Sequence, residues 1–272
     1  MEEDSFVAKI VHRLIKKHIA GNTMSSAIKK TKQLNGKGIV VSITFLSDAP
    51  KDLSKSSYIT ATYSQLIREI SRLGLKASLH IPLEQLGANI SKEATLANAR
   101  KIVEFGNKYG VFVWFEAENN DNIIKELASH KGVGIALKDL GSALLFSSKN
   151  KPKTLKLILT NKLDEKGINS IKKLADKTRL VVLSQNDPMI EKLIKMNSYK
   201  KSLIFEFQLG YSEKKLGKWA KKGVGVGVYL PFGRDWVSYA LKNMPAGYMH
   251  SIASSLLVEK EKRGKGGKNE EK

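Results

Sequence analysis

Short apolar runs rich in branched residues alternate along the chain with longer segments that have a helical period. Each short run is almost continuously apolar, which is typical of a parallel strand covered on both faces. The eight predicted strands are Ile39–Phe45, Ala77–Pro82, Val111–Phe115, Val133–Leu137, Leu155–Leu159, Arg179–Leu183, Leu203–Gln208 and Val224–Tyr229. The helical pattern is plainest in Ser57–Leu73, Lys92–Tyr109, Glu165–Lys177 and Ser212–Lys222.

The spacing of these runs predicts a closed barrel. A strand recurs every ~22–38 residues, and eight such units in about 250 residues are typical of a (β/α)8 barrel rather than an open doubly wound sheet. The connection Lys138–Lys153 has little helical pattern, so we expect this unit to be irregular and to end in a lysine-rich loop. A further helix, Phe6–Ala20, is expected before the first strand.

The pattern predicts one domain, residues 1–258, followed by a charged tail, residues 259–272, that has no core-forming residues and should be disordered alone. No apolar run approaches the ~20 residues that span a bilayer, and the acidic start lacks the order of a secretory signal. The absence of cysteine excludes disulfides and thiolate chemistry. We therefore expect a cytoplasmic protein with no membrane partner, and the sequence leaves its oligomeric state open.

Charge changes this picture, because the chain is strongly basic. Its 47 Lys and Arg against 26 Asp and Glu give a net charge of +21 and a pI of about 9.9. A small-molecule enzyme does not need this excess, whereas a polyanionic partner favours it. The excess is also concentrated, since residues 146–163 contain five lysines and no acid. Solvated lysine-rich faces are the other explanation.

From this charge we predict structured RNA or the ribosome as the partner, bound through phosphates with little sequence specificity. The residues assigned to this contact are Lys149, Lys151, Lys153, Lys200, Lys201, Lys214, Lys215, Lys262, Arg263 and Lys265. The five histidines show no metal-ligand spacing, so no metal site is predicted.

Several short segments resemble a known family in order and spacing. Phe205-Glu206-Phe207-Gln208 and Tyr229–Trp236 resemble the last two strands and the final loop of the proline dehydrogenase family, flavin enzymes built on a β/α barrel. Earlier segments with the same resemblance are Ile19–Thr23, Leu34–Ile39, Gln85–Gly87, Phe112–Glu118 and Asn186–Pro188. The resemblance implies a (β/α)8 barrel of this type.

The resemblance also implies a site. If this chain were an active member of the family, this site would bind FAD and oxidise L-proline to pyrroline-5-carboxylate. The pocket would then be lined by Glu206, Tyr229 and Lys242, and the cofactor would be contacted by Gln208, Lys162 and Asp187.

The positions that carry the family's functional side chains differ in this chain. The lysine that ends the family's second strand matches Pro82, with His80 two residues earlier, the histidine of strand 6 matches Asn186, and the arginine of strand 8 matches Gly227. Lys242-Asn243 stands where two arginines hold the substrate carboxylate, and it lacks their bidentate geometry. Because a charge-assisted hydrogen bond contributes about 1.5–3 kcal/mol, these differences predict a barrel without bound FAD and depleted of its chemistry.

Two functions from different classes follow. The differing positions favour a catalytically depleted, proline-dehydrogenase-like barrel that acts as a basic RNA-binding or ribosome-associated protein. The retained strand 7 and final loop favour a divergent FAD-dependent proline dehydrogenase. Gly223–Gly227 adds no third function, because it lacks the G-x-G-x-x-G spacing and lies within a predicted strand.

Overall fold

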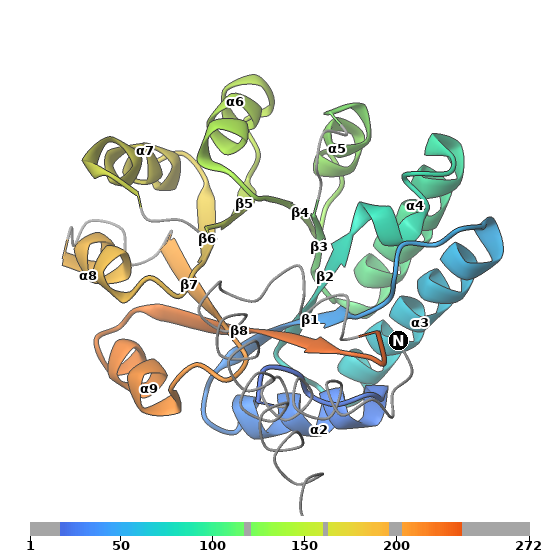
Figure 1. Cartoon of the computed structure of the whole chain (residues 1–272), viewed down its shortest axis with the longest axis horizontal. Coiled ribbons are helices and arrows are strands. Elements are labelled where there is room, and N and C mark those ends of the chain that lie inside the picture. Colours follow the sequence, from blue (N-terminus) through green and yellow to red (C-terminus); the bar gives the residue numbers. More distant parts are fainter. Residues whose placement is uncertain (1–16, 117–120, 160–162, 196–202, 236–272) are drawn as a thin grey trace, which may run out of the picture.

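The computed structural model describes residues 17–116, 121–159, 163–195 and 203–235. Within these ranges, eight parallel strands close into a barrel in sequence order, with β8 paired to β1 (Figure 1). The strands are β1 (Val40–Phe45), β2 (Ala77–Pro82), β3 (Val113–Glu116), β4 (Val133–Leu137), β5 (Thr154–Ile158), β6 (Arg179–Leu183), β7 (Leu203–Gln208) and β8 (Gly225–Phe232). The predicted (β/α)8 barrel is confirmed.

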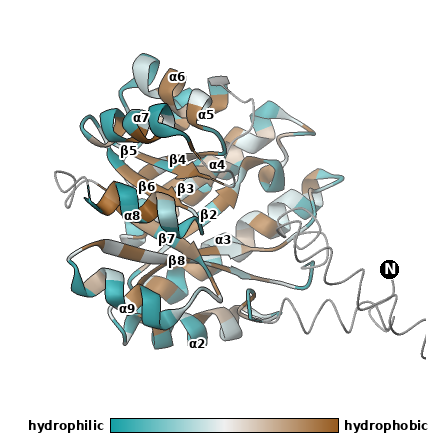
Figure 2. Cartoon of the chain, turned by 60° about the vertical axis from the view of Figure 1, so that its left-hand side comes forward, coloured by the Kyte–Doolittle hydropathy of each residue, from teal (hydrophilic) through white to brown (hydrophobic). Residues whose placement is uncertain are grey.

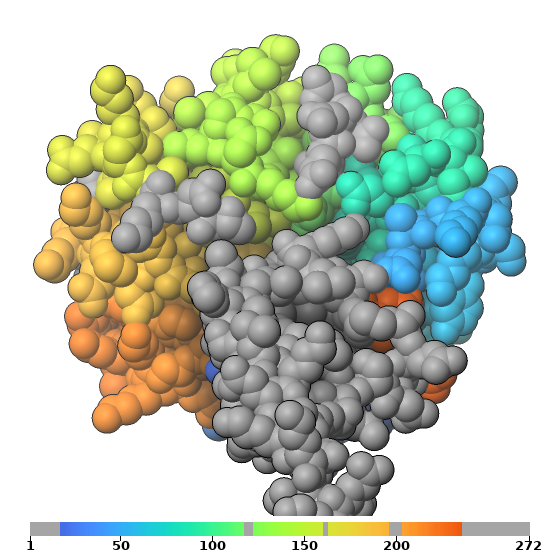
Figure 3. Space-filling model, in the orientation of Figure 1, coloured from blue at the N-terminus to red at the C-terminus, as the bar shows by residue number. Residues whose placement is uncertain are grey.

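Helices surround the barrel and connect successive strands. Figure 3 shows them from α3 round to α9 packed side by side, in the order of their colours. The helices are α2 (Met24–Asn35), α3 (Leu53–Arg72), α4 (Lys92–Tyr109), α5 (Asp121–Ala128), α6 (Leu140–Asn150), α7 (Glu165–Ala175), α8 (Asp187–Lys195) and α9 (Glu213–Lys221), with a 3-10 turn η1 (Leu83–Leu86). Asp52, Asp139 and Asp164 cap the first turns of α3, α6 and α7 by accepting from backbone N–H groups.

Helix α6 corrects the expectation of an irregular fourth unit. The Asp139 carboxylate accepts from the N–H of Ser142 at 2.7 Å, and Ala143 and Phe146 are buried under the helix. Three serines in this segment weaken its helical pattern, but burial of the apolar side chains overrides the low propensity. The lysine-rich loop expected after it, residues 151–153, is present.

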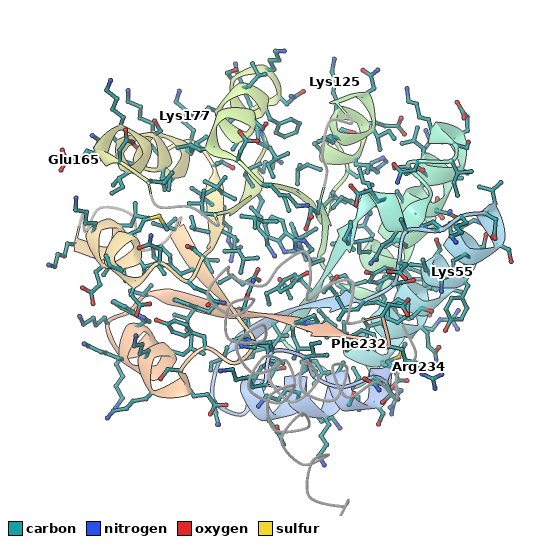
Figure 4. All side chains as sticks on the ribbon, viewed as in Figure 1. Lys55, Lys125, Glu165, Lys177, Phe232 and Arg234 are labelled. Atoms are coloured by element: carbon teal, nitrogen blue, oxygen red, sulfur yellow. The ribbon has the colours of Figure 1, made fainter. Side chains whose placement is uncertain are left out.

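Alternate strand residues divide between two environments. Odd-numbered residues of β1 such as Ile43 pack into the buried apolar layer beneath the helices, whereas Ser42 lies inside the barrel. Figure 2 shows the strands mostly hydrophobic and the helices hydrophobic on one side only. Figure 4 shows Lys125 and Glu165 pointing outwards from the helix ring. None of the helices in the described ranges is long and apolar enough to cross a membrane.

Three expectations lie wholly or mostly outside the described residues. The helix expected at 6–20 is described only from Lys17, where residues 17–18 form a turn, and α2 is the helix that directly precedes β1. The tail, residues 259–272, and the Lys242-Asn243 pair are not among the described residues.

Two helical glycines allow a matched test of packing. A methyl group on Gly106 in α4 would lie 2.8 Å from the carbonyl oxygen of Val111, whereas one on Gly217 in α9 would meet nothing within 4 Å. We expect Gly106→Ala to lower the free energy of unfolding by about 1–3 kcal/mol, and Gly217→Ala to raise it by about 0.5–1 kcal/mol. Urea unfolding followed by circular dichroism measures both. Equal stability of the two variants would contradict this packing.

Candidate functional site

A lysine side chain lies fully buried inside the barrel. Lys156, in the middle of β5, donates from Nζ to Glu206 Oε2 of β7 at 2.9 Å and to Ser42 Oγ of β1 at 3.0 Å. Its Nζ is also 3.4 Å from His80 Nδ1 of β2 and 4.6 Å from the centre of the Trp114 ring. All three ammonium hydrogens therefore have an acceptor.

These contacts determine the form of His80. An ammonium group can only donate, so Nδ1 of the ring accepts from Lys156 and Nε2 carries the proton. That Nε2–H donates to Glu116 Oε2 at 2.6 Å. The ring also packs edge-on against Tyr229, with 5.0 Å between the ring centres. His80 is thus a neutral link between the ammonium of Lys156 and the carboxylate of Glu116.

Burial and neighbouring charges shift the pKa values of this network. Burial lowers the pKa of His80, and the ammonium of Lys156 lowers it further. Burial also lowers the pKa of Lys156, against the opposing attraction of Glu206. For Glu116, burial acts to raise the pKa, but the hydrogen bond from His80 and the charge of Lys138, 3.0 Å from its Oε1, hold it below its ordinary value.

The network stands at the centre and the strand ends of the barrel. Glu116 is the last residue of β3, and Lys138 directly follows β4. The carboxyl ends of the strands are where β/α barrels carry their chemistry. Shifted pKa values and paired charges in such a position are typical of a functional site.

The structure brings together some of the residues predicted for an active site. Glu206 and Tyr229 both belong to the interior network. Gln208, the last residue of β7, accepts a hydrogen bond from Gln185 at 2.7 Å. Asp187 lies apart at the start of α8, where Tyr211 and Lys215 both donate to it. Lys162 and Lys242 lie outside the described residues.

The differing positions have distinct environments. Pro82 ends β2, and the buried histidine that contacts the network is His80. Asn186 accepts from the N–H of Met189 in the first turn of α8, which is a structural capping contact. Gly227 lies nearer the beginning of its strand and lines a pocket at the opposite end of the barrel.

Sequence reasoning missed Lys156 as a site residue and counted it among the lysines of the basic stretch 146–163. Its signal was its position inside the apolar run Leu155–Leu159, where an ammonium needs buried partners. The partners Ser42, His80 and Glu206 come from distant segments, and no local pattern links them to Lys156.

A pocket of about 280 Å³ opens where the strands begin, at the end of the barrel opposite to the carboxyl ends. It is lined by Val40, Val41, Ser42, Lys76, Ala77, Ser78, Phe112, Trp114, Thr154, Arg179, Val181, Ile204, Glu206 and Gly227. Ser42 and Glu206 contact Lys156, so the pocket reaches the interior network from the end where the strands begin.

The residues predicted to bind RNA do not form one surface. Lys149, Lys151 and Lys153 are exposed at the end of α6 and in the loop that leads into β5. Lys214 and Lys215 lie at the opposite end, in the first turn of α9, and Lys215 is paired with Asp187. Lys200, Lys201, Lys262, Arg263 and Lys265 lie outside the described residues.

Charge is divided between the two ends of the barrel. In the described part of the chain, Asp176 is the one acid among the loops that lead into the strands. The first residue of β6 is counted with these loops. Their cations are Lys37, Lys76, Lys131, Lys151, Lys153, Lys177, Arg179 and Lys222, and we call this the basic end. The described loops that follow the strands carry six acids, Asp48, Asp52, Glu84, Asp139, Asp164 and Asp235, against Lys51, Lys138 and Arg234.

Comparison with curated proteins supports the resemblance noted in the sequence. The chain is 24% identical over 260 residues to proline dehydrogenase 1 of Bacillus subtilis subsp. natto, covering 84% of this chain and 85% of that protein. It is 22% identical to the proline dehydrogenase of Deinococcus radiodurans, covering 83% and 84%. No protein-family model matches the chain. The resemblance to proline dehydrogenases is confirmed, at distant identity.

Solved structures with the same fold include proline utilization A (PutA) proteins. PutA from Bdellovibrio bacteriovorus, inactivated by N-propargylglycine, matches with a TM-score of 0.67 and 16% identity over 83% of this chain. PutA from Corynebacterium freiburgense matches with a TM-score of 0.66 and 12% identity over 93%. The chain spans about a third of the length of these proteins, 32% and 34%. They confirm the barrel fold.

The neutral, buried His80 predicts acid sensitivity. Because its pKa in the folded state lies below 6.5, the unfolded chain binds more protons below that pH, and stability falls as the pH decreases from 6.5. Each such group contributes up to about 1.4 kcal/mol per pH unit. Glu116, whose pKa is lowered from 4.5, adds a further loss of stability as the pH falls below 4.5.

We expect His80→Gln to flatten the decrease in unfolding free energy below pH 6.5. The loss below pH 4.5 should become smaller as well, because Glu116 loses the hydrogen bond from the His80 ring and keeps the charge of Lys138. Urea unfolding at a series of pH values measures it. His130→Gln, at an exposed position, is the control and should follow the unsubstituted protein. An unchanged slope in His80→Gln would contradict the neutral form of His80.

Proposed function

We propose that this chain is an oxidoreductase of the proline dehydrogenase type, which uses FAD to oxidise proline or a related cyclic imino acid. The observation that carries the proposal is the buried network around Lys156. The similarity to curated proline dehydrogenases over 84% of the chain supports it.

The cost of the network argues that it has a function. The interior of a β/α barrel is ordinarily filled with branched apolar side chains, which stabilise the fold without charges. Burying one ion costs several kcal/mol even after relaxation, and a buried pair seldom stabilises more than apolar residues of similar volume would. The fold therefore does not need Lys156, Glu206, His80 and Glu116 inside the barrel, whereas a reaction site does.

The described interior residues fit a flavin ring in their chemistry. A flavin ring has a polar edge that takes hydrogen bonds, and it gains negative charge on reduction, which a fixed cation stabilises. Lys156 is a fixed cation whose three hydrogens already have acceptors inside the protein, so it would act on the ring through its charge. Gln208 of β7 and Tyr229 of β8 lie nearer the carboxyl ends of their own strands. When bound, FAD would supply the two-electron oxidant for the carbon–nitrogen bond of the substrate.

The protein's own residues have separable roles. Glu206 and Ser42 hold the Lys156 ammonium at one point, so its charge needs no reorganisation during the reaction. Glu116 and Lys156 keep His80 in the form protonated at Nε2. Tyr229 packs against the ring and limits its rotation. Together these contacts preorganise a polar interior.

Removal of the interior charge tests the proposal. We expect the purified protein to take up FAD and to reduce a dye with L-proline. Lys156→Met should lower kcat/KM by about 10²–10³-fold, in line with the loss of one preorganised electrostatic contact. Glu206→Gln, which is isosteric and keeps an acceptor for Lys156, should lower it by a smaller factor. N-propargylglycine, which inactivates the Bdellovibrio PutA, should inactivate this protein irreversibly.

Lys153→Met is the matched control, because it makes the same change three residues away at an exposed position. It should retain full activity. A protein that takes up no added FAD, or a Lys156→Met variant as active as the control, would remove the proposal.

A second candidate function, RNA binding, is favoured by the basic end. Its cations come from six loops and from the start of β6, and nearly all are exposed without an acid in the same loop. Part of this arrangement neutralises the carboxyl ends of the helices. Because the basic end is opposite to the carboxyl ends of the strands, RNA binding and catalysis do not compete for the same residues.

The triple variant Lys151→Gln/Lys153→Gln/Lys177→Gln tests this second candidate. We expect weaker binding to a structured RNA and a decrease of about 2–3 in the slope of log affinity against log salt. The control is Lys55→Gln/Lys92→Gln/Lys166→Gln, which removes the same charge from the first turns of α3, α4 and α7. Equal losses in the two triple variants would mean that net charge alone attracts RNA, and would exclude the basic end as a specific surface.

A further inference from the structure

The pocket at the basic end exists because small residues replace a layer of the barrel core. A (β/α)8 barrel is ordinarily filled by three layers of side chains. Here Gly227 of β8 provides no side chain, and Ser42 and Ser78 are short. A Cβ atom on Gly227 would already lie 3.3 Å from Val40 Cγ2. The missing volume forms the pocket of about 280 Å³.

Charge in the pocket is ordered from the mouth inwards. Lys76 and Arg179, both exposed, lie where β2 and β6 begin. Glu206 lies at the inner end, with a side chain that is 5% exposed. A ligand in the pocket therefore places an anionic group outwards at the two cations. Its inner end meets a carboxylate, so that end must be a hydrogen-bond donor.

The walls between these ends are mainly apolar. Phe112, Val181 and Ile204 line them, and the mouth includes Val40, a valine that is 43% exposed. Such walls suit a short hydrocarbon chain better than a hydrated one. The volume, slightly below the ~300 Å³ at which sites for drug-sized ligands begin, limits the ligand to a small molecule.

The register of the sheet gives the length of the ligand. Glu206 pairs with Leu183, which is four residues beyond Arg179 on β6. At about 3.3 Å per residue this separation is roughly 13 Å along the strands. Both side chains reach into this span, so the anionic group and the donor of the ligand are separated by several bonds but by less than roughly 13 Å. An α-amino acid carries both groups on one carbon and does not span this length.

We propose that this pocket binds an extended small carboxylate of about five carbons with an amino or hydroxyl group at its far end. The carboxylate is held by Arg179, whose planar fork gives bidentate contacts, and by Lys76. The far-end group donates to Glu206. This pocket opens at the end opposite to the proposed oxidation and shares Ser42 and Glu206 with the interior network, and binding in it does not depend on FAD.

Three probes of equal length test the two ends of the ligand, with binding measured by calorimetry on the full chain without proline or dye. We expect 5-aminopentanoate to bind, pentanoate to bind at least tenfold more weakly because it lacks the donor, and pentylamine not to bind because it lacks the carboxylate. Equal binding of 5-aminopentanoate and pentanoate would overturn the role of Glu206. Failure of all three probes to bind would overturn the site.

Variants locate the site. Arg179→Gln should weaken 5-aminopentanoate at least tenfold, and Gly227→Leu, which fills the pocket, should abolish binding. Arg72→Gln is the control, because Arg72 is exposed near the same end, is paired with Glu69 and does not line the pocket. Equal binding in Arg179→Gln and Arg72→Gln would overturn the proposal, and since both residues are exposed, neither substitution removes a buried contact.

Discussion

The ion pair between Lys156 and Glu206 crosses the interior of the barrel from β5 to β7, and the polar interior is arranged around it. Removing one member of such a pair leaves an uncompensated buried charge, which costs about 3–5 kcal/mol. Each remaining donor of Lys156 therefore needs an acceptor from another strand. Ser42 provides one and His80 the other. The neutral form of His80 follows from this pair, and the charged form of Glu116 follows from His80 together with Lys138.

Much of the fold could be predicted from the sequence, because parallel strands covered on both faces are apolar almost throughout. Runs such as Val133–Leu137 and Leu203–Gln208 are strands with the predicted bounds. Helix α6 was not predicted, because its serines make the local helical pattern ambiguous. The face of the helix that is buried is determined by packing against the barrel. Helix ends were better signalled where an aspartate such as Asp164 caps the first turn.

The site was less predictable, because its contacts are not local. Glu206 and Tyr229 could be proposed from a family resemblance, but nothing in the sequence near Lys156 indicates a serine 114 residues earlier or a carboxylate 50 residues later as its partners. The number of lysines in a stretch likewise does not show which of them are exposed. Lys153 is exposed and Lys156 is fully buried, although they lie three residues apart in one acid-free stretch. Closure of the barrel buries Lys156 and leaves Lys153 exposed, and the amino-acid composition alone cannot predict which lysine is buried.

The division of charge between the two ends gives the barrel an electric dipole along its axis. A dipole of this kind acts before any contact is made, since it turns the protein in the field of an approaching ion and raises the rate of productive encounter at low salt. The charges of the described loops draw anionic molecules towards the end where the strands begin. On a negatively charged surface, the charges of the described loops favour the orientation in which the carboxyl ends of the strands face the solvent.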